Sequence, residues 1–174
     1  MKFDIYVYAT KKEAKQTFNL TEYLQAVRNR GATLVIFNIN GYGILSNDFL
    51  GEIIDKQLTA SKLISDRGEL TIPEVTVNII KKAFGTVVIS YYQGVKEKVP
   101  FSTRTDIGEG QVIYVNLYPI TSSLQEEQAN NITSLLLKSA LILSIAGVNL
   151  SKYCKKETAD IRDKFIFKDI TING

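Results

Sequence analysis

The first group of residues that could do chemistry is a polar loop that follows an apolar run over residues 33–37. The loop contains two glycines and three polar residues: Gly41, Gly43, Ser46, Asn47 and Asp48. Glycines permit a tight turn, and the polar side chains can accept hydrogen bonds from the free N–H groups that begin a helix. A helix N-terminus also attracts anions. The loop is therefore either a ligand or phosphorylation loop, or an ordinary turn before a capped helix.

A second compact group lies further along the chain and combines cationic, acidic and glycine residues: Arg104, Asp106, Gly108, Glu109 and Gly110. The Asp-x-Gly-x-Gly spacing resembles the phosphate loops of actin-like ATPases, so a carboxylate- and Arg-based enzyme acting on a phosphate-containing ligand is one interpretation. A hairpin turn that uses the two glycines is the other. The sequence leaves open whether this loop and the first one form a single site.

Two residue types that commonly carry chemistry are scarce. The chain has no histidine and a single cysteine, Cys154. This removes the most common general base and metal ligand, and it excludes an internal disulfide or a zinc site built from several cysteines. Cys154 lies among lysines, which could make it reactive, or it is simply a packing or surface residue. We assign no catalytic residue and expect no cofactor and no bound metal.

A strand–loop–helix unit is predicted to position the first loop. The run Thr33–Phe37 is short, β-branched and bounded by glycines, as in a strand buried on both faces. A helix capped by Asn19 precedes it and ends at Gly31. A second helix is predicted to follow the loop, because its apolar residues lie at helical spacing and form one stripe: Phe49, Leu50, Ile53, Ile54 and Leu58. This helix could continue to Ile64 and stop at Gly68.

Residues 32–58 resemble the STAS-like regulatory domains of the anti-sigma-factor-antagonist type. The resemblance rests on a hydrophobic strand over 34–37, the loop Leu45-Ser46-Asn47, and a helix that opens with Phe49 and soon reaches Glu52. It implies a phosphorylatable residue at Ser46, exposed at the start of the helix. The chain departs from the family because it lacks the Asp-Ser-Ser/Thr-Gly loop and has too many predicted strands in its middle.

The remaining chain predicts a mixture of strands and helices. Strands are expected over 3–8, 86–92, 111–118 and 165–170, with another over 99–103 that Pro100 places at a sheet edge. Pro73 suits the first turn of a helix that extends to Phe84, although Val75 and Val77 are equally compatible with a strand.

A long helix is predicted over 124–146, with a capping box at Ser123 and a stop at Gly147. Its apolar residues extend nearly all round, so it is either the central helix of the domain or half of an oligomer contact. The most apolar part, 135–146, is too short for a membrane span, which needs about 20 residues. We therefore expect no membrane association.

These observations favour a single α/β domain over residues 1–174, with a mixed sheet of five or six strands and packed helices; an α+β arrangement is also compatible. The net charge is +3, with 45% hydrophobic and 22% charged residues, as in ordinary soluble proteins. The lysines and tyrosines are dispersed, so we do not expect nucleic acid as a partner. The lone cysteine and the lack of a signal-peptide pattern predict a cytoplasmic protein.

Three functions remain open. The preferred hypothesis is a non-catalytic protein interaction or assembly module, whose partner is another protein or a second copy in a homo-oligomer. The alternatives are a STAS-like phosphorylation-linked regulator and the carboxylate- and Arg-based enzyme.

Overall fold

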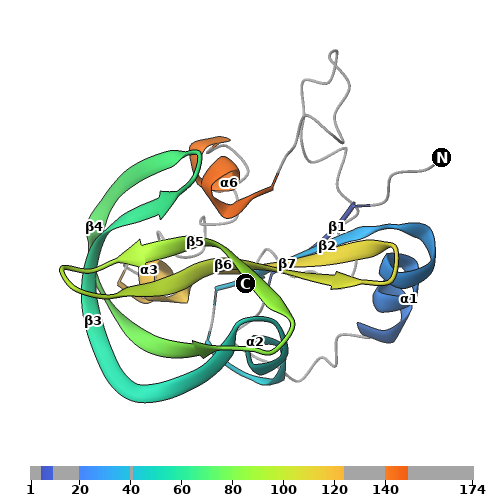
Figure 1. The fold of residues 1–174 in the computed structure, drawn as a ribbon, viewed down its shortest axis with the longest axis horizontal. Coiled ribbons are helices and arrows are strands. Elements are labelled where there is room, and N and C mark those ends of the chain that lie inside the picture. Colours follow the sequence, from blue (N-terminus) through green and yellow to red (C-terminus); the bar gives the residue numbers. More distant parts are fainter. Residues whose placement is uncertain (1–4, 10–19, 40, 124–139, 149–174) are drawn as a thin grey trace.

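The computed structural model describes residues 5–9, 20–39, 41–123 and 140–148. In these residues one mixed sheet of seven strands has the order β1-β2-β7-β6-β5-β3-β4 (Figure 1). The predicted mixed sheet is confirmed, but the expected five or six strands are too few. The strands are β1 Ile5–Ala9, β2 Thr33–Asn38, β3 Gly51–Ser65, β4 Gly68–Lys82, β5 Thr86–Gln93, β6 Lys98–Ile107 and β7 Gly110–Asn116.

Four helices belong to the described part of the chain: α1 Leu20–Arg30, α2 Ile44–Phe49, α3 Tyr118–Ser123 and α6 Ala140–Ala146. In Figure 1, α1 lies beside the β1, β2 and β7 end of the sheet, and β3 and β4 curve along the opposite side. No helix in the described ranges combines the length and apolar character that crossing a membrane requires.

The strands predicted over 3–8 and 33–37 are confirmed as β1 and β2. β1 pairs with β2 and β2 pairs with β7, both in parallel. Every residue of β2 is buried, which explains its uninterrupted apolar run. The Tyr6 ring of β1 contacts the Tyr23 ring of α1 edge-on, with centroids 5.0 Å apart. The predicted stop of α1 is confirmed by Gly31, whose φ is +73°.

The two helices predicted between Phe49 and Phe84 are wrong. Residues 51–65 and 68–82 form the two long strands of an antiparallel hairpin, β3 and β4. The register shifts between Ile53 and Gln57 and again between Ala60 and Lys62. Such bulges break the strict alternation of a strand, so the apolar residues fall three or four apart and imitate a helical stripe.

β5 and β7 confirm the strands predicted over 86–92 and 111–118. The edge position predicted for Pro100 is wrong, because β6 lies between β5 and β7. Pro100 is tolerated inside the sheet because it lies beside Tyr91, at an irregularity of the β5–β6 register. A residue without an N–H is accommodated where the ladder is already interrupted.

The end of the predicted long helix is confirmed, and its start is not. α6 ends before Gly147, which has a φ of +85° and donates its N–H to the Ser144 carbonyl at 3.1 Å. The expected N-cap at Ser123 is wrong, because the chain is already helical from Tyr118 to Ser123. Residues 124–139, Asn19, Cys154 and the predicted strand over 165–170 lie outside the described residues.

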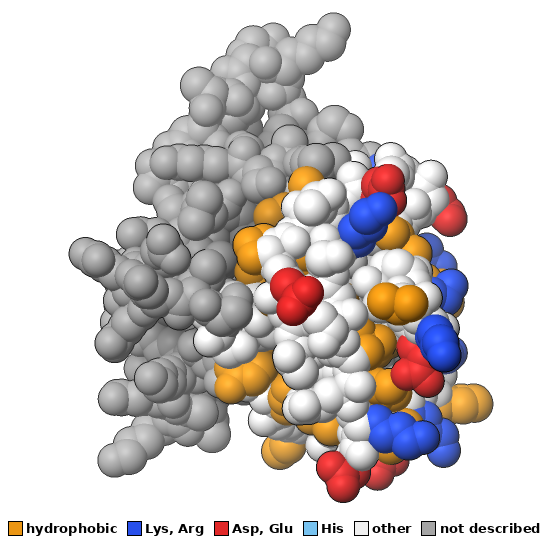
Figure 2. Space-filling view, turned by 90° about the vertical axis from the view of Figure 1, so that its left-hand side faces the viewer, with side chains coloured by type: hydrophobic (Ala, Val, Ile, Leu, Met, Phe, Trp, Pro, Cys, Tyr) orange, Lys and Arg blue, Asp and Glu red, His pale blue; other side chains and the backbone are white. Residues whose placement is uncertain are grey.

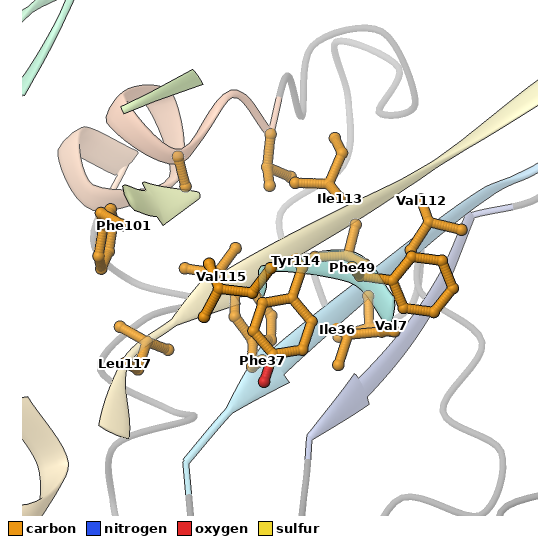
Figure 3. Packing of buried hydrophobic residues seen from close by; sticks show 14 of the residues in the cluster. Val7, Ile36, Phe37, Phe49, Phe101, Val112, Ile113, Tyr114, Val115 and Leu117 are labelled. Atoms are coloured by element: carbon orange, nitrogen blue, oxygen red, sulfur yellow. The ribbon is translucent and has the colours of Figure 1, made fainter. Parts of the chain in front are cut away.

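The core is continuous from the parallel strands to the antiparallel ones. It combines side chains of β2, β7, α2 and β6 (Figure 3). At the β6 end, the Tyr92 ring meets the Phe101 ring edge-on, with centroids 5.2 Å apart. Both rings are fully buried. On the same side of the sheet, the Thr103 hydroxyl donates to the Phe49 carbonyl and ties β6 to the end of α2.

Candidate functional site

The first predicted loop leaves the carboxyl end of β2, beside the carboxyl end of β7. Asn38 ends β2, Asn116 ends β7, and the two residues are in register. The Asn38 amide Nδ2 donates to the Asn116 Oδ1 at 3.2 Å, and both residues are fully buried. The carboxyl ends of parallel strands are where α/β sheets commonly bind ligands.

The two asparagines hold the glycine loop in place. The Gly41 N–H donates to the Asn38 Oδ1 at 3.2 Å, and the Asn116 Nδ2 donates to the Tyr42 hydroxyl at 3.3 Å. Gly41 has a φ of +137°, a conformation that side chains rarely adopt. The Tyr42 ring packs edge-on against Tyr118, with centroids 5.4 Å apart. The amides therefore act as a brace between strand ends and loop.

Ser46 does not lie where the sequence analysis placed it. The helix begins at Ile44 rather than near Phe49, so Ser46 falls in its first turn and is 2% exposed. Its hydroxyl accepts from the Gly43 N–H and contacts the Gly43 carbonyl, both at 2.7 Å. The predicted exposure of Ser46 is wrong, and a kinase cannot reach the hydroxyl in this conformation. The STAS-like resemblance itself stays a prediction that no comparison tests. The neighbouring Asn47 and Asp48 are exposed.

The tyrosines at this edge are protonated phenols rather than bases. Burial raises the pKa of Tyr114, against a hydrogen bond from Ser46 that lowers it. Burial also raises the pKa of Tyr92, whose hydroxyl donates to the Asn116 carbonyl, and the pKa of Tyr42. All three phenols therefore stay protonated at neutral pH. In this cluster, amides and hydroxyls satisfy one another.

The second predicted loop is a hairpin turn between β6 and β7 that packs against the end of α1. A Cβ atom at Gly108 would lie 2.4 Å from the Arg28 carbonyl oxygen, and one at Gly110 would lie 2.2 Å from the Ala32 carbonyl oxygen. The Glu109 N–H donates to the Arg28 carbonyl at 3.0 Å. The glycines thus allow a close backbone contact, which agrees with the hairpin interpretation of this stretch.

The charged residues of that stretch neutralise each other. Arg104 and Asp106 lie on β6 itself, two residues apart and hence on one face. The Arg104 Nε lies 3.3 Å from the Asp106 Oδ1, and both side chains are partly exposed. Glu109 is exposed at the turn. Within the described ranges, no three potential metal-ligating side chains come together.

The two predicted loops do not form one site. The β2–β7 register runs from Thr33 beside Gln111 to Asn38 beside Asn116. The hairpin turn lies at the first end and Gly41 at the second, roughly 17 Å apart at about 3.3 Å per residue.

The turn between β4 and β5 carries an exposed aromatic residue that the sequence pattern did not predict. Phe84 was predicted on the apolar stripe of a helix, yet its side chain is fully exposed. Three contacts fix the turn around it. The Ala83 N–H donates to the Leu50 carbonyl at 3.1 Å, the Thr86 hydroxyl donates to the Ala83 carbonyl at 2.8 Å, and the Lys82 Nζ donates to the Thr86 carbonyl at 2.6 Å. We call residues 82–86 the Phe84 turn. The sequence signal for it was Phe-Gly between two lysines and a β-branched run.

The outer face of the β3–β4 hairpin is polar and balanced in charge. Figure 2, which views the side of the molecule where the hairpin lies, shows acidic and basic side chains interspersed with hydrophobic ones. The Lys62 Nζ lies 3.7 Å from the Glu69 carboxylate, and the Gln57 Nε2 donates to the Asn78 Oδ1 at 3.0 Å.

Comparison with known proteins gives structural similarities only. No family model matches the chain, and no curated protein matches it. A β-galactosidase from Bacillus circulans sp. alkalophilus aligns over 72% of this chain and 22% of its own, with 19% identity and a TM-score of 0.41. The exo-β-1,4-mannosidase Op5Man5 from Opitutaceae bacterium strain TAV5 aligns over 82% of this chain and 24% of its own, with 17% identity and a TM-score of 0.45.

A smaller protein also aligns. The cytoplasmic protein STM1381 from Salmonella typhimurium LT2 matches over 80% of this chain and 71% of its own, with 13% identity and a TM-score of 0.42. The chain spans less than a quarter of the length of the two glycosidases. Similarity at this level does not assign an activity to the chain.

Proposed function

We propose that this domain is a non-catalytic protein interaction module, and that the Phe84 turn is the anchor of its contact surface. The observation that carries the proposal is the full exposure of Phe84 on a turn whose backbone is fixed by hydrogen bonds. Large aromatic side chains that enter a pocket of a partner commonly dominate the free energy of protein–protein binding.

The bracing of the turn matters as much as the ring. A flexible loop loses conformational entropy when it binds, whereas a pre-organised one loses little. The Lys82 and Thr86 contacts already hold both sides of the turn in one conformation. An exposed phenylalanine side chain is unfavourable in water. Because the turn is already held in one conformation, burying the ring against a partner loses little conformational entropy.

The rest of the described surface supports a binding role over a chemical one. At the first loop, buried amides and protonated phenols bond to each other and to the backbone. At the second, Arg104 and Asp106 form their own pair, and the glycines are occupied with α1. The Arg104 side chain is thus already paired, whereas Phe84 is directed at solvent.

The proposal is tested with Phe84→Asp and a matched control, Val95→Asp, which also replaces a fully exposed apolar residue in a turn between strands. Each purified variant is immobilised and exposed to extract of the source cells, and any retained protein is then purified and titrated against each variant. We expect a stoichiometric partner that binds wild type and Val95→Asp but binds Phe84→Asp at least about thirtyfold more weakly, the equivalent of ~2 kcal/mol.

Two further results would decide the matter. Thermal unfolding should be the same for both variants, since neither residue contributes to the core. A partner that binds Phe84→Asp as tightly as wild type would contradict the proposal.

A further inference from the structure

The Phe84 turn is a β-turn whose backbone does not require a phenylalanine. The Thr86 N–H donates to the Ala83 carbonyl at 3.3 Å, which closes the turn over Phe84 and Gly85. Gly85 has a φ of +81°, the left-handed conformation that the third residue of a type II turn adopts. The second residue of such a turn has an ordinary φ near about −60°, which any side chain permits. The turn therefore depends on Gly85, and the side chain at position 84 can be exchanged without disturbing it.

The contacts that hold the turn differ in their exposure to water. Thr86 is 2% exposed, and its hydroxyl donates to the Ala83 carbonyl at 2.8 Å. The Ala83 N–H donates to the carbonyl of Leu50, which is fully buried. These two bonds belong to the packed fold. Lys82, by contrast, is exposed, and its Nζ reaches over the turn to the Thr86 carbonyl at 2.6 Å.

The Lys82 bond spans the turn from one flanking strand to the other. It joins the last residue of β4 to the first residue of β5, and Phe84 lies midway between them. A bond between an ammonium group and a carbonyl is charge-assisted. Water and salt compete for an ammonium group at the surface, so the bond also breaks readily. The buried bonds thus fix where the turn lies, and the exposed one can be made or released while the fold stays intact.

We propose that Lys82 is a positioning residue for Phe84. While its ammonium group is bonded to the Thr86 carbonyl, the ring is held in the orientation in which a partner receives it, and loss of the bond lets the ring move. A single exposed amine then regulates the contact, because neutralising or blocking it removes the charge that strengthens the bond. The consequence for binding rests on the function proposed above, whereas the ordering of residue 84 does not.

Lys81 provides a matched control on the same strand. It is exposed like Lys82 and carries the same charge, but adjacent residues of a strand direct their side chains to opposite faces. Lys81 lies beside Glu52 of β3, whereas Lys82 lies beside Gly51. Removing the Lys81 charge therefore changes the local electrostatics and leaves the bond to Thr86 in place.

The test uses the absence of tryptophan from the chain. Phe84→Trp introduces a single fluorophore on the turn, and time-resolved fluorescence anisotropy of the full chain measures how freely its ring moves. In this background Lys82→Met, which nearly keeps the length of the side chain and removes the donor, should increase the amplitude of the fast local motion about twofold. Lys82→Arg, which keeps a charged donor, should restore most of the order, and Lys81→Met should leave the amplitude unchanged.

Two further measurements separate positioning from other roles of Lys82. The thermal unfolding midpoints of Lys82→Met and Lys81→Met should agree, since neither exposed side chain belongs to the core. In titrations with the partner isolated through Phe84, Lys82→Met should weaken binding about threefold, and it should have no effect in a Phe84→Ala background. A lysine that contacts the partner directly would weaken binding in both backgrounds.

Four results would each overturn the proposal: an anisotropy decay that Lys82→Met leaves unchanged, equal disorder in Lys82→Met and Lys82→Arg, a midpoint lowered in Lys82→Met alone, or a loss of binding that persists in the Phe84→Ala background. Failure to isolate any partner that depends on Phe84 would contradict the proposed function instead. The anisotropy measurement would still decide whether Lys82 orders residue 84.

Discussion

The parallel strands β1, β2 and β7 differ from the β3–β4 hairpin in how they bury their side chains. β2 buries every one of its residues between two neighbouring strands and the layers on both faces of the sheet. The hairpin buries only part of each strand: four residues of β4 and three of β3 are buried, and residues 52–57 of β3 are exposed. The parallel strands thus depend on packing on both faces, whereas the hairpin depends on pairing between its two strands and on these buried residues.

This difference explains why one region is easy to predict and the other is not. A strand buried on both faces needs an unbroken apolar run, and few other structures give so short a run between glycines. A strand buried on one face needs alternation, and alternation is lost at a bulge. The buried residues of β4 are Ile72, Val75, Val77 and Ile80, whose spacing includes two steps of three.

The largest loss in the free energy of unfolding is expected when a core side chain of the parallel strands is truncated. Ile36→Ala in β2 should lower the free energy of unfolding by about 3–4 kcal/mol, because the fully buried side chain leaves a cavity that rigid strands cannot fill. Ile54→Ala in β3 should cost less than about 1 kcal/mol, since Ile54 is 41% exposed. Urea unfolding of both variants gives the two values, and equal losses would refute the contrast between the regions.

A smaller effect is expected at the glycines. Gly110→Ala should cost about 3 kcal/mol, because the added methyl meets the backbone carbonyls of Val27 and Ala32 at 2.4 and 2.2 Å. Gly68→Ala, at the hairpin turn, should cost about 1 kcal/mol from backbone strain alone, since nothing lies within 4 Å of its added methyl. Thermal unfolding would sharpen the comparison, and a Gly68→Ala variant less stable than Gly110→Ala would reverse it.

The buried amide hydrogen bonds of Asn38 should contribute less to the free energy of unfolding than the tight packing at Gly110 does. Asn38→Ala removes the partner of the Gly41 N–H and of the Asn116 side chain, so we expect a loss of about 2 kcal/mol. Gln57→Ala breaks an amide–amide bond of the same kind on the exposed face of the hairpin, and water can replace it. Its loss should stay below about 0.5 kcal/mol in the same urea titration. Equal losses of unfolding free energy in the two variants would contradict the expectation that burial makes these hydrogen bonds contribute more to stability.

The smallest effect concerns alkaline pH. Burial raises the pKa of Tyr92 well above its ordinary value of 10.0. The folded state therefore holds this proton more tightly than the unfolded state does. The resulting stability is fully present below pH 10 and is lost as the pH rises above it. Urea unfolding between pH 9 and pH 11 should show a decline that is shallower in Tyr92→Phe than in wild type, and identical slopes would contradict this assignment.

Particular residues show what the sequence can and cannot predict here. The strand at Val35, the helix that ends at Gly31 and the hairpin at Gly108 were all predicted, because each depends on local pattern and glycine conformation. The burial of Ser46 was missed, since it depends on contact with Gly43 and on a helix that begins at Ile44, earlier than predicted. The role of Gly110 was also missed, because its neighbours come from α1, far away in the sequence. Long-range contacts of this kind leave no local signal.

The position of β7 has a consequence for the order in which the molecule can assemble. β7 pairs with β6, its neighbour in sequence, and with β2, which lies more than seventy residues earlier. The β3–β4, β5–β6 and β6–β7 pairs are hairpins that close short loops, and the β3–β5 pair closes across β4, whereas the β2–β7 ladder must close a much longer loop. We therefore expect joining of β2 to β7 to limit the folding rate. β7 is paired with a strand on each side, so its amide protons should exchange with solvent only when the whole domain unfolds.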